Sequence, residues 1–589
     1  MAKILPLLFA FASSAIALTL PPVQYNAPSL KPRQTTCQNS ATSRSCWGDY
    51  SIDTNYYDEI PTTNVTREYW LSVEAGNCAP DGYPTTCMTF NGTVPGPLIT
   101  ADWGDNLIIH VTNNLVTNGT AIHWHGMRQL NSSDQDGVPG VTQCPIAPGE
   151  SLTYSFRATQ YGSSWYHSHF SLQYAEGLFG PLILNGPATA DYDEDLGMLF
   201  LSDWSHTPAF TLWDAARKGL APTLDGGLVN GTNTYNCTDA DTGCSGLVGA
   251  KYETVFESGK KYRFRIVNAA AEGHFQFSID GHSLTVIAND LVPIVPYTTD
   301  SVIISMGQRY DIIVEANATA KDYWLRAGWI KECSTNLHPD DMTGIVRYQR
   351  NSTATPTTES TVTTSGTCGD EPYESLVPHL ALDVGDITTT ADEELSFTVD
   401  TYFKWMLNDS SLLINWTAPV LVDVVEEKDV FPTDYNIVAL DVLTFSPQKQ
   451  SNDSSTSEWA LLVIEDTTGL GLWHPIHLHG HDFWIVAQAK GVFDPSNPGF
   501  TTTNPPRRDV ASIPANGHLA LAFKLDNPGV WLAHCHIAWH ASEGFSLEFV
   551  EGESTIAART SSSVKTTLED TCTTWNSWNE IYSQDDSGI

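Results

Sequence analysis

Residues 531 to 540 read Trp-Leu-Ala-His-Cys-His-Ile-Ala-Trp-His and concentrate side chains that bind transition metals. Successive side chains of a β-strand point to opposite faces, so Cys535 should face one side while His534 and His536 face the other. The segment can therefore hold a metal on each face. The peptide links from Cys535 to both histidines would give electrons a covalent path between the two sites, which predicts electron transfer rather than a structural zinc site.

The first of these sites forms where Cys535 meets two further histidines. His540 lies five residues after the cysteine, and His474 opens a second cluster, His-Pro-Ile-His-Leu-His-Gly-His. Two imidazoles and a thiolate in a trigonal arrangement with a weak axial position are typical of blue copper, whereas tetrahedral zinc needs a fourth strong ligand. The axial candidate, ten residues past the cysteine, is Phe545, which cannot donate to a metal.

Eight of the 18 histidines form four His-x-His pairs, and in extended chain each pair shares one face. The pairs are His123 with His125, His167 with His169, His477 with His479, and His534 with His536. A single histidine is more often a satisfied core or surface residue than a ligand. Four pairs make that explanation very weak, so we expect a site with several metal ions.

The four motifs resemble those of a known family. His-Trp-His-Gly, His-Ser-His, His-Pro-x-His-Leu-His-Gly-His and His-Cys-His-Ile-x-x-His look like the copper signatures of multicopper oxidases, more narrowly of ascomycete laccases, and the similarity spans residues 34–589. It implies one type 1 copper, one type 2 copper and a type 3 pair. The ligands expected from it are His474, Cys535 and His540 for type 1; His123 and His477 for type 2; and His125, His167, His169, His479, His534 and His536 for type 3. His481 lies in a motif but is not expected to be a ligand.

Length and composition indicate a β-rich protein of several domains. A single core is implausible at 589 residues, and the 16% of charged residues, 42 Gly and 33 Pro suit a chain of short strands and turns. The resemblance narrows this to an all-β fold of three cupredoxin-like β-sandwich domains. Their expected ranges are 34–187, 188–349 and 369–589, with a Ser/Thr-rich linker at 350–368.

An internal repeat supports this division. Residues 122–126 echo 476–480, and residues 162–169 echo 529–536. The simplest geometry packs the early and the late unit face to face, with a copper cluster between them. Only the late unit carries the cysteine, so the type 1 site should belong to that unit alone.

The N-terminus predicts export. Residues 1–17 contain Lys3, an apolar run and Ala-Ile-Ala, which together indicate a signal peptide, and residues 18–33 are a candidate propeptide. No later run is long and apolar enough to span a bilayer. The net charge of −39 argues against nucleic acid or an anionic membrane as partner. We expect a secreted, extracellular monomer with a glycosylated surface, because eleven Asn-x-Ser/Thr sites include Asn91, Asn230 and Asn415.

Eleven cysteines minus the metal ligand leave ten, which permits five disulfides and fits an oxidising compartment. Cys37 with Cys46, Cys78 with Cys87 and Cys237 with Cys244 are close enough to be local pairs. The resemblance suggests Cys144 with Cys572 and Cys333 with Cys368. Sequence alone does not fix the connectivity.

As a function, the resemblance implies that of a laccase: one-electron oxidation of phenols and aromatic amines at the type 1 copper, coupled to four-electron reduction of O2 to water at the three-copper cluster. His540, Cys535, His534 and His536 would connect the two sites. An extracellular metallo-oxidase for ferrous or cuprous ions is an alternative, although its yeast-type version has a membrane anchor that this chain lacks. A non-catalytic copper-binding wall protein is another, and eleven intact ligands argue against it. A lignin fragment, a defence phenolic and a pigment precursor all stay open as natural substrate.

Two further positions bear on the chemistry. Asp136 matches the family's acidic residue near the type 2 copper and could relay protons; the alternative is a turn aspartate before Gly137. Phe545 leaves the oxidised type 1 copper less stabilised than an axial methionine would, which should raise its potential and favour phenols.

The substrate cleft is inferred from the resemblance alone. Its expected lining, beside the edge of His540, is Ala221, Pro222, Phe403, Trp405, Leu470 and Leu472. Phe403 and Trp405 are i and i+2 on a strand and fit a plain core equally well. Related laccases place a carboxylate in this pocket, at a position that falls on Ala250 here. The usual proton acceptor is thus missing unless Glu253 or Glu257 substitutes.

The chain ends in Asp-Asp-Ser-Gly-Ile, which resembles the processed end of many ascomycete laccases. By that similarity Ile589 should enter the channel to the three-copper cluster. A frayed terminus is the alternative. Cys572 as an anchor and the apolar Trp575 and Trp578 favour an ordered tail.

Overall fold

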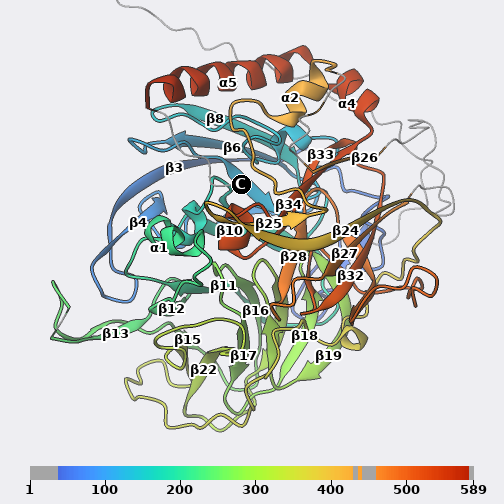
Figure 1. Cartoon of the computed structure of the whole chain (residues 1–589). Coiled ribbons are helices and arrows are strands. Elements are labelled where there is room, and N and C mark those ends of the chain that lie inside the picture. The colour runs from blue at the N-terminus through green and yellow to red at the C-terminus, as the bar shows by residue number, and fades with distance from the viewer. Residues whose placement is uncertain (1–36, 240, 429–430, 432–435, 441–458, 583–589) are drawn as a thin grey trace, which may run out of the picture. The chain divides into compact units, whose positions relative to one another are not determined.

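Strands dominate the described residues, and the six sheets of four or more strands fall into three pairs along the chain. Figure 1 colours the strands from blue to red in chain order. The computed structural model describes residues 37–239, 241–428, 431, 436–440 and 459–582. The expected all-β fold of cupredoxin-like sandwiches is confirmed. The exact domain boundaries stay a prediction. The signal peptide, the candidate propeptide and Ile589 lie outside the described residues.

The first pair of sheets has the orders β4-β3-β6-β8 and β5-β10-β9-β7. The strands are β3 (Thr66–Cys78), β4 (Thr85–Phe90), β5 (Ile99–Asp102), β6 (Asn106–Asn113), β7 (Ile122–His125), β8 (Ser151–Arg157), β9 (Gly162–Ser168) and β10 (Phe179–Asn185). Leu107, Ile109 and Val111 of β6 are buried at every second position and join Trp124 and Tyr166 of the other sheet in one core. One core shared by residues of both sheets makes this pair a sandwich, with alternating burial along β6 and continuous burial along β7 and β9.

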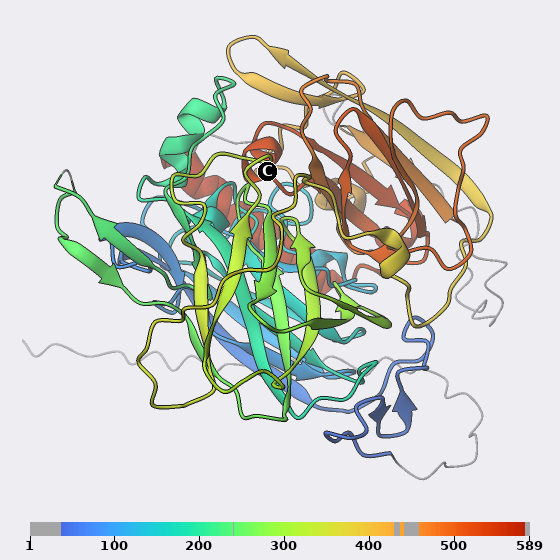
Figure 2. The ribbon, with the colours of Figure 1, turned by 90° about the horizontal axis from the view of Figure 1, so that it is seen from below.

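The second pair has the orders β12-β11-β16-β21-β18-β19 and β15-β23-β22-β17-β20. The strands are β11 (Glu194–Trp204), β12 (Gly226–Val229), β15 (Glu253–Val255), β16 (Lys261–Asn268), β17 (Phe275–Ile279), β18 (Leu284–Asn289), β19 (Val292–Thr299), β20 (Val302–Ile304), β21 (Arg309–Glu315), β22 (Asp322–Trp329) and β23 (Thr343–Arg347). Seen from below in Figure 2, these green and yellow strands are distinct from the orange and red strands of the third pair.

The third pair has the orders β25-β24-β27-β32-β29-β30 and β26-β34-β33-β28-β31. The strands are β24 (Ile387–Val399), β25 (Phe403–Leu407), β26 (Ile437–Leu440), β27 (Trp459–Asp466), β28 (His474–Leu478), β29 (Phe483–Lys490), β30 (Arg507–Arg508), β31 (Val510–Ile513), β32 (Gly517–Lys524), β33 (Gly529–Cys535) and β34 (Ser546–Glu551). The repeat seen in the sequence corresponds to β7 and β9 in the first pair and to β28 and β33 in the third.

Smaller elements complete the described chain. Two short hairpins join β1 (Cys46–Trp47) to β2 (Tyr50–Ser51) and β13 (Thr234–Cys237) to β14 (Gly246–Gly249). The helices are α1 (Ala209–Ala216), α2 (Val420–Val425), α3 (Ala538–Ser542), α4 (Glu553–Arg559) and α5 (Ser562–Tyr582), with 3-10 turns η1 (Ser133–Gln135), η2 (Gln173–Glu176) and η3 (Tyr373–Ser375). Among the described helices, none combines the length and the apolar character needed to cross a bilayer.

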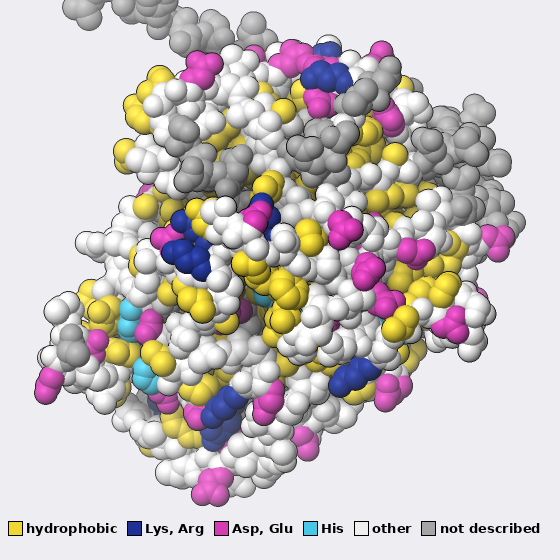
Figure 3. Space-filling model, viewed as in Figure 1, with side chains coloured by type: hydrophobic (Ala, Val, Ile, Leu, Met, Phe, Trp, Pro, Cys, Tyr) yellow, Lys and Arg dark blue, Asp and Glu magenta, His cyan; other side chains and the backbone are white. Residues whose placement is uncertain are grey.

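Cys535 is free and buried, and the other ten cysteines form the five expected disulfides. The Cys144–Cys572 bridge ties α5 to the loop before β8, and α5 lies beside β8 in Figure 1. Trp575 is fully buried in the core beneath the helix. On the face drawn in Figure 3, carboxylates are spread more widely than lysines and arginines, in keeping with the net charge of −39.

Candidate metal centre

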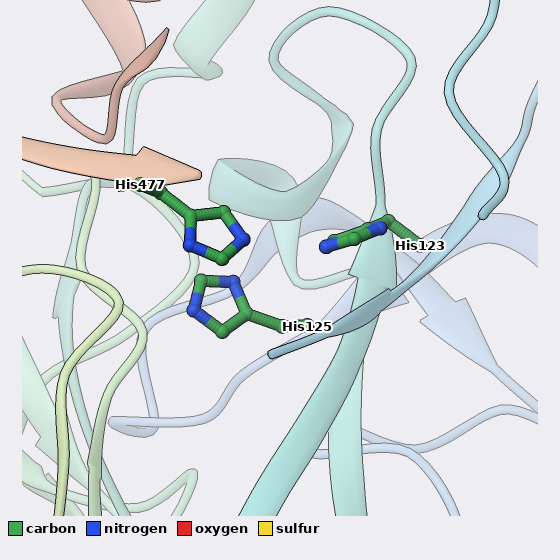
Figure 4. Close-up of side chains that lie close together, drawn as sticks. All are labelled: His123, His125 and His477. Atoms are coloured by element: carbon green, nitrogen blue, oxygen red, sulfur yellow. The ribbon is translucent and has the colours of Figure 1, made fainter. Parts of the chain in front are cut away.

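Four segments bring eight histidines together between the first and third pairs of sheets. Backbone pairing sets His123 of β7 against His167 of β9, and His477 of β28 against His534 of β33. The rings interlock across the two units: His125 stacks on His477 with centroids 3.9 Å apart (Figure 4). The face-to-face arrangement expected from the repeat is therefore present.

The ring nitrogens of this cluster follow one rule. The Nδ1 atoms of His123, His167, His477 and His534 each lie 2.8–3.0 Å from a backbone carbonyl oxygen, which can only accept a hydrogen bond. Each Nδ1 therefore carries the proton. The opposite Nε2 atoms of these four histidines are buried, have no hydrogen-bond partner among the described residues, and present their lone pairs to the centre of the cluster. Unsatisfied buried acceptors are rare and call for an explanation, and a bound ion is one such explanation.

These donors fit copper. Three sets of ligand atoms lie within 4.8 Å of one another: His123, His125 and His477; His125, His167 and His536; and His169, His479 and His534. Burial lowers the pKa of His477 and His479 well below the usual value, so their rings are neutral, as metal binding requires. Together the three sets contain the eight histidines expected around the type 2 copper and the type 3 pair, and His125, expected for type 3, also lies in the set with His123 and His477. The assignment of each ligand to one copper stays a prediction.

Asp136 supports two of these rings. The residue follows η1 and is fully buried. One carboxylate oxygen accepts a hydrogen bond from Nδ1 of His479 at 2.8 Å, and the other lies 3.2 Å from Nδ1 of His123. Asp136 is thus both a turn residue and a partner of the cluster, so the two interpretations of this position are compatible.

Cys535 faces the opposite side of β33, as the strand alternation predicts. Its Sγ lies 3.8 Å from Nδ1 of His474 and 3.7 Å from Nδ1 of His540, and the two nitrogens are 3.1 Å apart. Two nitrogens and one sulfur thus converge on one point, which is the donor set of a blue-copper site. Phe545 is buried with its ring centroid 5.1 Å from that of His474, and it offers no donor atom.

Aromatic rings cover this second site. Trp405 on β25 is 2% exposed, and its ring centroid lies 4.5 Å from that of His540. Phe403 is half-buried against Trp405, and its N–H donates to the carbonyl of Arg217 just after α1. Ala221 and Leu470 are exposed, Leu472 is half-buried and Pro222 is buried. Trp405 is therefore a core residue that packs against His540, the partly exposed histidine of this site, and Phe403 packs against Trp405.

The structure also places a carboxyl group that the sequence analysis missed. Glu272 lies in the loop between β16 and β17 and accepts a hydrogen bond from Nε1 of Trp539 at 2.8 Å. Trp539 directly precedes His540 in the chain. Its other carboxyl oxygen is buried and has no hydrogen-bond partner in the part of the chain that the structure describes. Burial and the neighbouring Asp203 raise the pKa of Glu272 to about 8.

Ala250, where a pocket carboxylate was sought, lies elsewhere. It is exposed after β14, and its N–H donates to the carbonyl of Asn233. Glu253 and Glu257 do not replace it: Glu253 pairs with Arg347, and Glu257 pairs with Lys260 at the surface. Position 250 directly follows the disulfide-bonded hairpin of β13 and β14. The acid in the sequence Ala-Ala-Ala-Glu-Gly-His after the strand at 261–267 was the signal that could have located the carboxylate.

Comparisons with known proteins agree with this geometry. Family models described as multicopper oxidase match residues 72–189, 195–351 and 414–555. The chain is 59% identical to Laccase-2 of Botryotinia fuckeliana, over 99% of this chain and 98% of that protein, and 52% identical to Laccase-1 of the same fungus, over 98% of each. The crystal structure of the laccase from Botrytis aclada superposes with a TM-score of 0.89 at 59% identity, covering 94% of this chain and all of that one.

Proposed function

The chain belongs to the multicopper oxidase family and is a laccase of the fungal type, and on this premise we propose how its residues divide the work. Laccases of this family use four copper ions and act on phenols with O2. When bound, the coppers supply one-electron oxidation of the substrate at the type 1 position and four-electron reduction of O2 to water at the three-copper cluster.

We assign the ligands as the donor atoms suggest. The single observation that carries the assignment is the convergence of unpartnered buried ring nitrogens from four separate segments. Type 1 takes His474, Cys535 and His540; type 2 takes His123 and His477; and the type 3 pair takes His125, His167, His169, His479, His534 and His536. Because Cys535 sits between His534 and His536, the backbone of β33 holds the type 1 site and the cluster at a fixed spacing.

The remaining residues bind, orient and move protons. The partly exposed ring of His540 is the point of contact for the substrate, with Trp405, Phe403 and the segment around Ala221 as walls. Glu272, once ionised, accepts the phenol proton at its free Oε1 as the phenol loses one electron, which leaves a phenoxyl radical. Asp136 holds the proton on Nδ1 of His479, and it is the group placed to pass protons toward the cluster. Aromatic amines fit the same cleft.

The decisive test is oxygen uptake by the copper-loaded protein with a phenol, an aromatic amine, ferrous ion and ascorbate. We expect phenol and amine oxidation with water as the product. Oxidation of ferrous ion alone would favour a metallo-oxidase, and uptake with none of the four would favour a non-catalytic protein. Cys535→Ser should lose the blue colour and phenol oxidation while keeping the other three coppers. A variant that still oxidised phenols at the normal rate would contradict the assignment.

We also propose that the protein is secreted and acts as a monomer. The signal peptide expected at residues 1–17 carries the first proposal. N-terminal sequencing of protein from the culture medium and light scattering of the purified protein test the two. Intracellular retention of the full chain or a stable dimer would contradict them.

A further inference from the structure

A fully buried ion pair joins the three pairs of sheets beside the cluster. Arg309 of β21 binds Asp509 with two hydrogen bonds of 2.5 Å, from Nη1 and Nη2, and both residues are 0% exposed. Nε of Arg309 donates to the carbonyl of Ser163 on β9 at 3.3 Å. Asp509 lies between β30 and β31, so one guanidinium connects the second pair of sheets to both others.

A second carboxylate, that of Asp290, holds the Arg309–Asp509 ion pair in place. Asp290 accepts hydrogen bonds from the backbone N–H of Arg309 at 2.9 Å and of Asp509 at 3.1 Å, and from Nε of Arg508 at 3.0 Å. Burying charges in this way is costly unless every donor and acceptor is paired. Such a network, placed far from any surface, holds the Asp509 carboxylate in one orientation.

Asp509 contacts two of the proposed ligands. Its backbone carbonyl accepts the Nδ1–H of His477 at 2.8 Å, and its Oδ1 lies 3.5 Å from Nε2 of His125. The space is closed: a Cβ on Gly126, next to His125, would lie 2.4 Å from both Nη2 of Arg309 and Oδ2 of Asp509. A Cβ on Gly307, at the start of the turn into β21, would lie 2.8 Å from Cδ2 of His536.

The contact between Asp509 and His125 reverses the proton placement of the other rings, in which Nδ1 carries the proton and Nε2 the lone pair. A carboxylate without a proton can only accept, so a hydrogen placed between Oδ1 and the ring belongs to Nε2 of His125. The lone pair of His125 is then on Nδ1. Within the described residues both ring nitrogens of His125 are buried without a hydrogen-bond partner, so the approach of Oδ1 to Nε2 at 3.5 Å is what distinguishes them. His123, His167, His477 and His534 use the opposite tautomer, with the lone pair on Nε2.

We propose that Arg309 and Asp509 are positioning residues that fix His125 in the Nδ1-ligand tautomer and hold it against His477. The residues at 188–349 supply none of the eight cluster histidines, yet through Arg309 they would set the geometry of the three-copper cluster. The inference rests on the proposed copper assignment. Partners of this kind typically change metal affinity by about 10- to 100-fold when removed.

The test compares two buried arginines of the same sheet. Arg309→Met and Arg309→Lys remove the forked contact, and Lys keeps the charge without the fork. Arg263→Met is the matched control: Arg263 is 4% exposed on the neighbouring strand β16, and its polar partners within the described residues are Tyr192, Asp195 and Asp311 rather than cluster histidines or Asp509. The readouts are copper per chain during titration with a competing chelator, the type 3 absorption band, the type 1 blue band and the thermal midpoint.

We expect both Arg309 variants to bind copper at the cluster about tenfold or more weakly and to alter the type 3 band, with the blue band unchanged. Arg263→Met should lower the thermal midpoint and keep four coppers with a normal type 3 band. Should Arg309→Met fail to fold, Arg309→Lys and Asp509→Leu carry the same measurement. Arg309 variants with four tightly bound coppers and an unaltered type 3 band would overturn the inference. Wild-type protein that binds no copper would instead refute the proposed function.

Discussion

Glu548 gives a prediction that needs no copper chemistry. The residue lies in the middle of β34 opposite Leu532, is 0% exposed, and both carboxyl oxygens lack a hydrogen-bond partner within the described residues. Burial alone raises its pKa from 4.5 to about 8. The folded protein therefore keeps this proton up to about pH 8, whereas the unfolded chain loses it near pH 4.5.

The sign and size of the effect follow from linkage. Between these two pKa values the folded state binds one proton more than the unfolded chain, so the free energy of unfolding falls as pH rises, by about 1.4 kcal/mol per pH unit. From pH 5 to pH 7.5 the loss is about 3 kcal/mol. Glu548→Gln keeps the shape without the titration, so the variant should gain about 3 kcal/mol over wild type across this interval. For a domain-sized unit this equals roughly 6 to 12 °C in the thermal midpoint.

The assay is thermal unfolding of wild type and Glu548→Gln at pH 5 and pH 7.5, at equal copper loading, so that metal contributions cancel. Glu551 of the same strand is the control, because its carboxylate already accepts hydrogen bonds from His481 at 3.0 Å and from the N–H of Asn527 at 2.7 Å. Glu551→Gln weakens these contacts and should lower the midpoint. Equal changes of the midpoint with pH in wild type and Glu548→Gln would refute the reasoning.

Three further predictions concern the cleft and the tail. Because burial raises the pKa of Glu272 to about 8, its ionised fraction and the kcat/KM for a phenol should both rise from pH 6 to pH 8. Glu272→Gln should flatten this pH profile and lower kcat/KM about tenfold at pH 8, with little effect on a non-phenolic dye. A phenol profile that the substitution leaves unchanged would show that Glu272 takes no part in the reaction. Ala250→Asp should leave kcat/KM for a phenol unchanged, because position 250 is exposed after β14. A clear rise of kcat/KM in steady-state kinetics would show that position 250 lines the substrate pocket. Cys572→Ser frees α5 from the Cys144 loop and should lower stability by about 2 to 5 kcal/mol in urea unfolding, whereas unaltered unfolding would show that packing of Trp575 suffices.

The candidate copper ligands could be proposed from the sequence because the signal is local. His123 with His125, or His534 with Cys535 and His536, are short segments whose strand geometry dictates which side chains share a face. The same alternation places Cys535 away from its neighbours, and the structure has it there. The repeat in the chain then indicates how two such segments meet.

Other residues carry no local signal. Arg309 and Asp509 are 200 positions apart, and a buried charge has no mark in sequence before its partner is known. Glu272 accepts a hydrogen bond from Trp539, 267 positions later, and no local pattern indicates that contact. Residues 250–259 carry no local signal that separates a surface position from a buried one, and the structure exposes Ala250 directly after the hairpin of β13 and β14.

The central claim is that four coppers sit on eleven named side chains. Diffraction from crystals of copper-loaded protein, measured on either side of the copper absorption edge, tests it most directly. The account predicts four anomalous peaks: one between Cys535, His474 and His540, and three enclosed by the eight cluster histidines, with the density of the His125 ring meeting its copper at Nδ1. Fewer than three peaks among those histidines, or no peak beside Cys535, would contradict it.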